Sequence, residues 1–174
     1  MQVMLLVDLR AVATGPFETK AEIAIDDPIL EGLELALQEP LRVEGRLTSS
    51  GPSQYYWQGR LATRLASACR RCLEPMTVDV DASVSALFTE EEGADDASTY
   101  VIQRDGTELD LGPMVREELA LAAPKYVTCR DSCKGLCAHC GKDLNQGPCS
   151  CEPEPDPRWA VLRALRTDGP DTER

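Results

Sequence analysis

Histidine, aromatic side chains and basic charge are all scarce in this sequence of 174 residues. It contains one histidine, 5% aromatic residues, and 18 Lys and Arg against 30 Asp and Glu, which gives a formal net charge of −12. The single histidine, His139, lies inside a CxxC pair, so we expect no Ser-His-Asp or Cys-His catalytic set, and no glycine-rich phosphate loop is present. The acidic balance repels polyphosphates at long range, so any contact with RNA requires a local basic patch.

Long apolar runs are also missing. No stretch approaches the roughly 18 apolar residues that are needed to cross a bilayer. The N-terminus, MQVMLLVDLR, has no basic region before its apolar run, which ends at Asp8, so we expect neither a signal peptide nor a transit peptide. We therefore expect a cytoplasmic protein without membrane contact. Thiols stay reduced there, and the eight cysteines are expected to bind metal or act in catalysis rather than form disulfides.

Three segments alternate apolar and polar residues with a period of two, which indicates strands with one buried face. They are residues 41–47, 57–69 and 76–88. Turn residues separate the first two at 50–53, and the last two are separated by 69–75. The pattern predicts an antiparallel meander with one solvated face, and weaker strand signals lie near the N-terminus, at 1–9 and 19–25.

Residues 110–124 change to helical spacing. Asp110 can cap the helix, Pro113 lies in its first turn, and Pro124 ends it. Its stripe is formed by Leu111, Met114, Val115, Glu118, Leu119 and Ala122. We expect this helix to cover the buried face of the sheet. The acidic run at 90–96 is expected to be a loop, followed by a short strand near 100–104.

These patterns predict an α+β fold, with an antiparallel, barrel-like β-sheet covered by one helix and a small Cys-rich, zinc-binding C-terminal segment. We expect the sheet and its covering helix (109–123) to occupy residues 1–128. The Cys-rich segment then spans 129–155. Residues 156–174 are expected to form a short helix and a disordered tail.

The eight cysteines carry the strongest chemical signal. Cys69 with Cys72, and Cys137 with Cys140, form CxxC pairs, a spacing that lets two thiolates converge on one tetrahedral ion. Gly141 permits the left-handed turn that such a knuckle often adopts. Eight thiolates make two complete four-cysteine sites, so we predict two zinc ions as cofactors.

The eight cysteines can be divided into two fours in several ways. Gly141, Gly147 and Pro148 allow the last four to close as one compact loop. This favours one site of Cys137, Cys140, Cys149 and Cys151, and another of Cys69, Cys72, Cys129 and Cys133. The second site would tie the turn between two strands to the chain just after the helix, across a long loop. A division centred on Cys133, Cys137 and Cys140 stays open.

Other roles for the cysteines are weaker. Arg70 and Arg71 could lower the pKa of a redox CxxC, but Cys69–Cys72 follows a strand, whereas redox pairs open a helix in a βαβ unit. Iron–sulfur clusters also use four cysteines, but knuckles with turn glycines suit zinc better. His139 could replace a cysteine ligand, although spacer residues in such knuckles usually point to solvent.

A set of arginines offers a weak candidate for nucleic-acid binding. Its members are Arg42, Arg46, Arg60 and Arg64 on the polar faces of two strands, and Arg70 and Arg71 in the adjoining knuckle. Guanidinium forks suit phosphates, so together they would make a basic stripe. The alternative is an ordinary solvated face, balanced by Glu44, Asp79 and Asp81.

Several motifs resemble those of the bacterial YceD family. They are C-R-R-C-L-E-P at 69–75, the D-L-G-P-M-V-R-E-E-L helix followed by Pro124, and C-K-G-L-C-x-x-C-G-x-x-L-N with C-x-C and D-P-R behind it. The resemblance covers about 41–165, and Ala138 stands where the family often has Pro. It implies a role in accumulation of 23S ribosomal RNA and in large-subunit biogenesis, with no known enzymatic activity. The functional residues that it carries over are the cysteines.

Sequence and resemblance together favour a non-catalytic accessory factor in 23S rRNA accumulation and large ribosomal subunit biogenesis, stapled by Cys-ligated zinc. Its expected partner is pre-ribosomal RNA or a large-subunit ribosomal protein, with no small-molecule substrate. One alternative is a protein-interaction module that escorts a basic ribosomal protein, guided by its acidic surface. A thiol-redox enzyme is the third hypothesis.

Overall fold

The computed structural model describes residues 5–90, 99–102, 106–151 and 158. Apart from residue 158, the short helix and tail expected at 156–174 therefore lie outside the described residues, as does most of the acidic run. In chain order the elements, with η for a 3-10 helix, are β1 (Leu6–Asp8), α1 (Leu9–Ala13), β2 (Phe17–Ile23), η1 (Pro28–Leu30), β3 (Ala36–Leu37), β4 (Leu41–Gly51), β5 (Gln54–Ala68), β6 (Pro75–Thr89), β7 (Thr99–Val101), β8 (Glu108–Asp110), α2 (Gly112–Ala122) and η2 (Leu144–Gln146).

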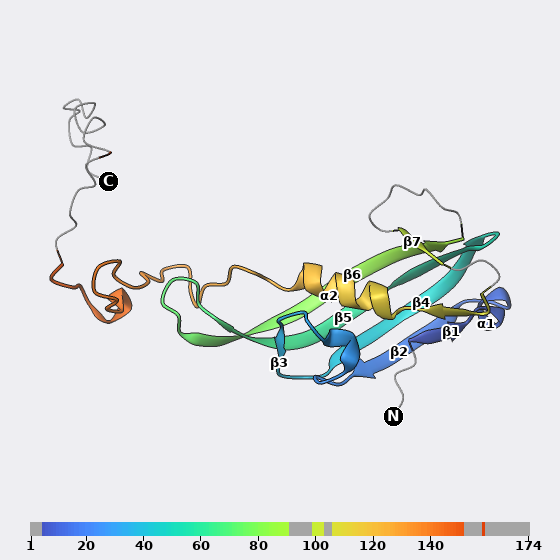
Figure 1. Cartoon of the computed structure of the whole chain (residues 1–174), viewed down its shortest axis with the longest axis horizontal. Helices are drawn as coiled ribbons and strands as arrows, with labels where there is room; N and C mark the ends of the chain where they lie inside the picture. The colour runs from blue at the N-terminus through green and yellow to red at the C-terminus, as the bar shows by residue number, and fades with distance from the viewer. Residues whose placement is uncertain (1–4, 91–98, 103–105, 152–157, 159–174) are drawn as a thin grey trace.

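Three long strands form the centre of the molecule (Figure 1). β4, β5 and β6 pair as an antiparallel meander, as their alternation predicts, and the sheet has the order β2-β4-β5-β6-β7 with β3 on β5. β7 departs from the expected antiparallel arrangement because it runs parallel to β6, with Leu87 opposite Thr99. The weak N-terminal signals become β1 and β2.

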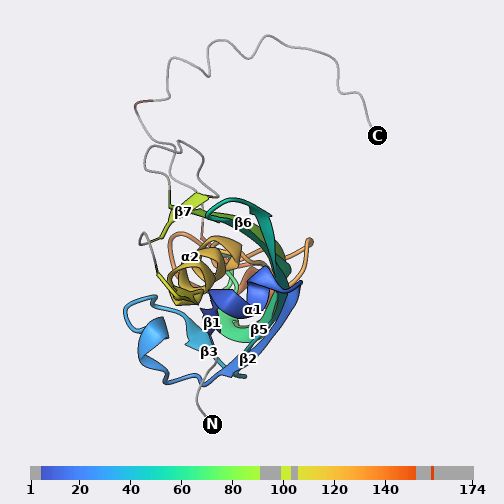
Figure 2. The same cartoon turned by 90° about the vertical axis from the view of Figure 1, so that its right-hand side faces the viewer.

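The expectation of a barrel-like sheet is wrong. A barrel requires the first and last strands to pair, but among the described strands β2 and β7 are the free ends of an open order. The sheet instead curves around α2, which lies on its concave face (Figure 2). Leu111, Met114, Val115 and Leu119 are fully buried there. The helix fills the volume that inward side chains would occupy in a closed barrel.

Trp57 lies at the centre of the sheet's buried face. Gly45 and Gly59 stand opposite each other on β4 and β5, and a Cβ atom at either position would overlap the Trp57 ring. The indole Nε1 donates a hydrogen bond of 2.9 Å to Thr19 Oγ1 on β2. The two glycines therefore give the largest side chain of the core the room to lie flat across two strands.

The region around α2 begins differently from the predicted helix. Residues 108–110 form β8, which pairs with β1 and buries Leu109. Asp110 still accepts a hydrogen bond, from Gly112 N at 2.8 Å, but Leu111 holds the N-cap position, and the helix spans Gly112–Ala122 rather than the expected 109–123. No helix within the described ranges is long and apolar enough to cross a membrane.

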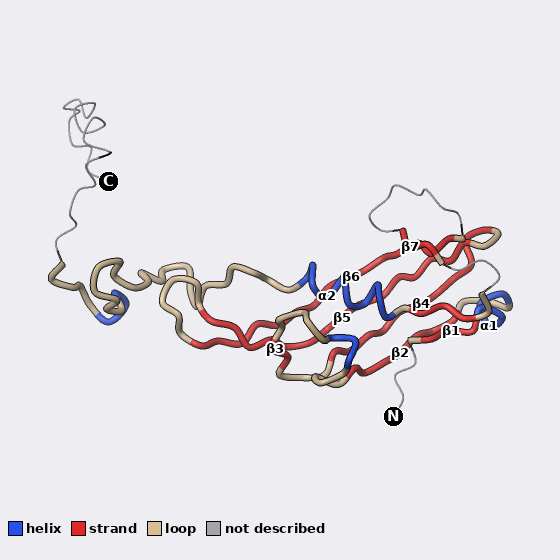
Figure 3. Tube along the Cα trace, in the orientation of Figure 1, coloured by secondary structure: helices blue, strands red, loops and turns tan. Residues whose placement is uncertain are grey.

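The Cys-rich segment lies beyond one end of the sheet. β5 and β6 extend past the region covered by α2, and their connecting turn meets the chain that follows the helix (Figure 1). Apart from η2, the described part of this segment consists of loops and turns (Figure 3). Its order must therefore come from contacts other than regular secondary structure.

Candidate metal centres

The eight cysteines gather in two groups of four, and within each group all sulfur atoms lie within 4.8 Å of one another. Quartet 1 consists of Cys69, Cys72, Cys129 and Cys133. Quartet 2 consists of Cys137, Cys140, Cys149 and Cys151. This is the division that the spacing favours, and the alternative centred on Cys133, Cys137 and Cys140 does not form. All eight thiols are free of disulfides.

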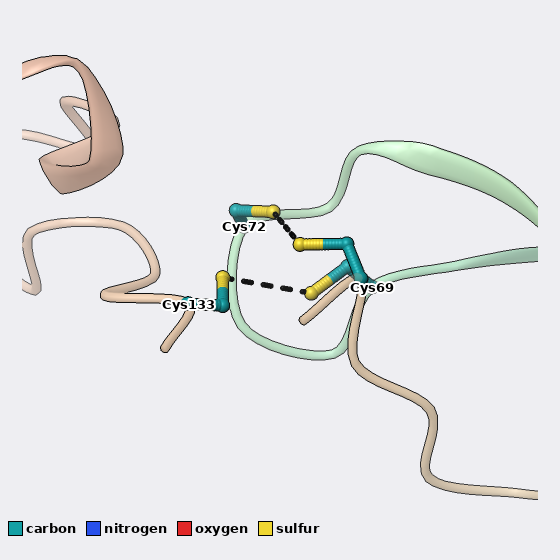
Figure 4. Close-up of side chains that lie close together, drawn as sticks. Cys69, Cys72 and Cys133 are labelled. Atoms are coloured by element: carbon teal, nitrogen blue, oxygen red, sulfur yellow. Dashed lines mark hydrogen bonds between the residues drawn. The ribbon is translucent and has the colours of Figure 1, made fainter. Parts of the chain in front are cut away.

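The sulfur spacing in quartet 1 matches a tetrahedral metal site. The Sγ atoms of Cys69 and Cys133 lie 3.8 Å apart (Figure 4), and those of Cys72 and Cys129 lie 3.7 Å apart. A zinc ion with Zn–S bonds of about 2.3 Å places its sulfur ligands about 3.8 Å apart at tetrahedral angles. A disulfide would hold them at about 2.05 Å. The donor set and its spacing therefore fit a four-cysteine zinc site.

Both CxxC pairs adopt the same backbone hairpin. Leu73 N donates to Cys69 O at 2.8 Å, and Gly141 N donates to Cys137 O at 2.9 Å. The residue after each pair is left-handed, with φ of 61° at Leu73 and 71° at Gly141. The left-handed turn expected at Gly141 is therefore confirmed. The first knuckle uses a leucine in the same role, at a cost of about 1 kcal/mol.

Backbone amides lower the pKa of one cysteine in each quartet and so favour its thiolate form. The amides of Cys129, Cys72 and Arg71 lower the pKa of Cys69 to about 6. The amides of Cys140 and His139 likewise lower the pKa of Cys137 to about 6. Hydrogen bonds to the charged form favour that form, and a metal-ligating cysteine must be charged.

At least one other thiol in each quartet resists ionisation. Burial and the neighbouring thiols raise the pKa of Cys129 to about 12. In quartet 2, a hydrogen bond with Cys140 and burial raise the pKa of Cys151 to about 12. Thiolates within one quartet would repel each other, because their like charges would lie only a few ångströms apart. A divalent cation at the centre would relieve that repulsion.

Arg71, one of the candidate arginines for nucleic-acid binding, joins the two halves of quartet 1. Its Nη1 donates to the carbonyl oxygens of Asp131 at 3.0 Å and Cys133 at 2.9 Å, and its own carbonyl accepts from Leu136 N at 3.0 Å. The position next to Arg71 requires glycine. Gly135 has a left-handed backbone, with φ of 73°, and a Cβ atom added to it would lie only 2.8 Å from Arg71 O. Arg71 therefore positions the chain that carries Cys133.

Arg70 also contacts the chain that follows the helix. Its backbone N–H donates to Val127 O at 2.9 Å, and its guanidinium lies 5.8 Å from the centre of the Tyr126 ring. Tyr126 is 77% exposed, which is unusual for an aromatic side chain. Arg70 and Tyr126 thus form an exposed cation–π pair next to quartet 1.

The sheet arginines lie on the solvated face, but carboxylates accompany them. Arg46 pairs with Glu18 at 2.6 Å, Arg60 pairs with Asp81, and Arg64 contacts both Asp79 and Glu39 at 2.8 Å. Arg42 lines a hollow on this face together with Arg60, Glu44 and Asp81. Carboxylates thus partly neutralise three of the sheet arginines, and a role for the six arginines in RNA binding stays a prediction.

Asn145 is a site residue that the residue patterns alone did not identify. Its Nδ2 donates to Cys133 Sγ at 3.6 Å, although Asn145 lies between the cysteines of quartet 2. The one available signal was its place in the L-N that ends the family-like motif. His139 is exposed and belongs to neither quartet.

A family model and several known proteins are similar to this chain. A family model described as "Large ribosomal RNA subunit accumulation protein YceD" matches residues 57–166, which include all eight cysteines. An uncharacterized protein of Mycobacterium tuberculosis is 30% identical over 155 residues, covering 87% of this chain and 70% of its own length. An uncharacterized protein of Mycobacterium leprae is 31% identical over 151 residues, covering 81% and 68%.

A maize chloroplast protein named as a YCED homolog of the same accumulation protein is 26% identical over 126 residues, covering 55% of this chain and 43% of its own. No solved structure matches significantly. The family model covers more than half of the chain and includes both the knuckle turn of quartet 1 and the whole of quartet 2. The chain therefore belongs to the YceD family, whose name describes a role in the accumulation of large-subunit ribosomal RNA.

Proposed function

We propose that this protein is a non-catalytic accessory factor in 23S rRNA accumulation and large ribosomal subunit biogenesis in the cytoplasm, and that each quartet holds one structural zinc ion. The observation that carries the proposal is the closed nature of both sites. Each gathers four cysteine sulfurs, and four protein ligands leave no coordination position for a substrate or a reactive water. Family membership supplies the biological context.

The proposed zinc ion in quartet 1 acts as a cross-link. Cys69 and Cys133 are 64 residues apart in sequence, and Cys72 and Cys129 are 57 apart. Joining the β5–β6 turn to the chain after α2 reduces the conformational freedom of the unfolded state across this long loop. The staple holds the Cys-rich segment in a fixed place at the end of the sheet.

We place the RNA contact at this end of the molecule, with pre-ribosomal RNA as the partner. Arg70 and Tyr126 present a guanidinium and an exposed ring side by side, a combination that suits unpaired bases and phosphates. On the sheet face, by contrast, Asp81 and Asp79 already neutralise Arg60 and Arg64 and would repel a phosphate.

A second candidate function is the escort of a basic large-subunit ribosomal protein. The net charge of −12 and the carboxylates of the sheet face favour it, because complementary charge speeds association and selects partners. A thiol-redox role has less support. Cys69 has no exposed surface, and a reactive cysteine must be accessible.

Crosslinking to precursor 23S rRNA distinguishes the two candidates. Under the RNA hypothesis, the double variant Arg70→Gln with Tyr126→Ala loses most of its crosslinks. Arg42, Arg60 and Arg64 changed together to Gln should then have a small effect. Arg10→Gln, at an exposed position on α1, is the matched control. If neither set changes the crosslinks, but the sheet variants alter capture of a basic ribosomal protein, the escort hypothesis is favoured.

Depletion tests the assembly role itself. Cells that lack the protein should accumulate precursor 23S rRNA and show fewer 50S particles in sucrose gradients. Wild-type protein should restore both, and a variant with Cys72→Ser and Cys129→Ser should not. Normal 50S particles and normal 23S processing after depletion would overturn the proposal.

A further inference from the structure

We propose that Asn145 couples the two metal centres, so that the quartets load with metal cooperatively as one binuclear unit. The inference rests on the proposed zinc sites, and it adds a property that two independent sites would lack. It follows from a side chain held in the loop of one quartet that contacts a sulfur of the other.

Asn145 is fixed from its own side of the unit. It belongs to η2 (Leu144–Gln146), which lies between Cys140 and Cys149 in the loop that quartet 2 closes. Asp143 caps this turn, because its Oδ1 accepts hydrogen bonds from Asn145 N at 2.9 Å and from Asn145 Nδ2 at 2.7 Å. A metal ion in quartet 2 would tether both ends of the loop and so fix the orientation of the Asn145 amide.

The same amide contacts quartet 1 at two points. Its Nδ2 donates to Cys133 Sγ at 3.6 Å, and its Oδ1 accepts from the backbone N–H of Lys134 at 2.9 Å. The first contact orients the Cys133 sulfur of quartet 1, and the second fixes the backbone next to this residue. Asn145 is therefore an outer-shell positioning residue for quartet 1, although it is placed by quartet 2.

Backbone contacts brace the two loops against each other. Leu136 and Asp143 form an isolated antiparallel bridge, and Leu144 N donates to Gly135 O at 2.9 Å. Gly135 in turn adjoins Arg71, whose guanidinium holds the carbonyl of Cys133. The segment from Cys133 to Cys137, which joins the quartets, is thus held from both sides.

These contacts predict positive coupling between the sites. Removing an outer-shell partner typically weakens metal binding by about 10- to 100-fold, so emptying quartet 2 should weaken quartet 1 by a factor in that range. By linkage, emptying quartet 1 should weaken quartet 2 by the same factor. With equal intrinsic affinities, the singly loaded fraction at half saturation would fall from about a half without coupling to about a quarter at tenfold coupling.

Native mass spectrometry of the full chain during zinc titration measures these populations directly. Wild-type protein should pass from metal-free to two-metal species with little one-metal species. Asn145→Asp keeps the acceptor for Lys134 N–H but places a carboxylate against the Cys133 sulfur. Asn145→Ala removes both contacts without adding charge. Both variants should bind two zinc ions and accumulate the one-metal species.

Gln146→Ala is the matched control, because Gln146 Nε2 contacts Asp143 Oδ2 at 3.3 Å and no atom of quartet 1 is involved. It should load as the wild type does. In protein whose quartet 2 is broken by Cys149→Ser and Cys151→Ser, cobalt titration followed by its thiolate charge-transfer absorption reports quartet 1 alone. Its affinity should be about 10- to 100-fold weaker than in the intact protein, and Asn145→Ala should then add little.

The outcomes separate this inference from the proposed zinc sites. Protein that binds no zinc overturns the sites themselves. If the protein binds two zinc ions, two results would overturn the coupling. One is that Asn145→Asp and Asn145→Ala show the same fractions of one-metal and two-metal species as the wild type. The other is that quartet 1 keeps its full metal affinity after quartet 2 is broken.

Discussion

The sheet and the Cys-rich end of this molecule differ in what is buried. The sheet, α1 and α2 share one continuous apolar cluster that includes Trp57, Phe88 and Met114. Of residues 126–151, all of which are described, none belongs to that cluster, and the buried apolar side chains they contribute are those of Cys133 and Cys137. A segment this small cannot be stabilised by a core of its own, whereas metal binding can stabilise it.

The two regions are therefore stabilised by different interactions. Apolar burial, at about 25 cal/mol per Å², is sufficient for the sheet and its helix. In the Cys-rich end, order depends on converging thiols, on the Arg71 clamp and on the Asn145 bridge. Each region should therefore respond to a perturbation that leaves the other intact.

Metal removal should give the largest effect and should be confined to one region. Structural zinc sites contribute roughly 10–16 kcal/mol to the folding of small zinc domains. After chelation, hydrogen exchange should show that amides in 129–151 lose their protection, while β4, β5 and β6 keep theirs. If the sheet amides lost protection together with the Cys-rich amides, the two regions would fold as one unit and would not be stabilised independently.

Lowering the pH should weaken metal binding next most strongly, because protons compete with the metal for the thiolates. Cys69 and Cys137, with pKa values of about 6, are already charged near neutral pH. Loading a quartet at about pH 7.5 should then release at most three protons, and the number should rise toward four as the pH falls through about 6. Calorimetry in buffers of different ionisation enthalpy counts these protons, and four per quartet at pH 7.5 would contradict the lowered pKa values.

Trp57→Ala should destabilise the sheet by about 3–5 kcal/mol, because it empties the space over Gly45 and Gly59 and removes the hydrogen bond to Thr19. The neighbouring Tyr56→Ala, on the opposite face and 38% exposed, is the control and should cost less. Urea unfolding followed by circular dichroism measures both. Zinc stoichiometry should remain unchanged, and a loss of zinc in Trp57→Ala would connect the core to the metal sites.

The smallest expected effect is the difference between alanine substitutions at two glycines of the Cys-rich end, Gly141 and Gly135. Gly141→Ala places a side chain at φ 71° with no atom within 4 Å, so it should cost only about 1 kcal/mol of backbone strain. Gly135→Ala adds an overlap with Arg71 O at 2.8 Å and should release zinc to a chelator faster than Gly141→Ala. Equal release rates would show that the contact between Gly135 and Arg71 does not support quartet 1.

Local patterns predicted much of what is observed. The alternation at 41–47 and 76–88 placed Val43, Val80 and Phe88 on the buried face. The spacing of Cys137, Cys140, Cys149 and Cys151 grouped them correctly because all four lie in one short loop. Side chains on one strand or in one knuckle are near each other whatever the rest of the chain does, so sequence spacing was sufficient there.

Other features required contacts that sequence spacing does not report. The open sheet depends on how α2 packs against the concave face, and periodicity cannot tell an open curved sheet from a closed one. The pairing of the sheet arginines with carboxylates depends on cross-strand register, which puts Asp79 beside Arg64, while Asp81 reaches the neighbouring Arg60. The left-handed backbone at Leu73 was also unforeseen, because glycine is the usual residue there and the surrounding knuckle imposes the turn.

By itself the sequence determined which residues become the long strands and the covering helix, and which thiols are available to bind a metal. These properties follow from short-range sterics, side-chain alternation and thiol chemistry. Only the tertiary structure decided that the Arg71 guanidinium holds the carbonyl of Cys133 and that Asn145 reaches across to the Cys133 sulfur. Those contacts exist because the folded sheet and α2 bring distant segments together.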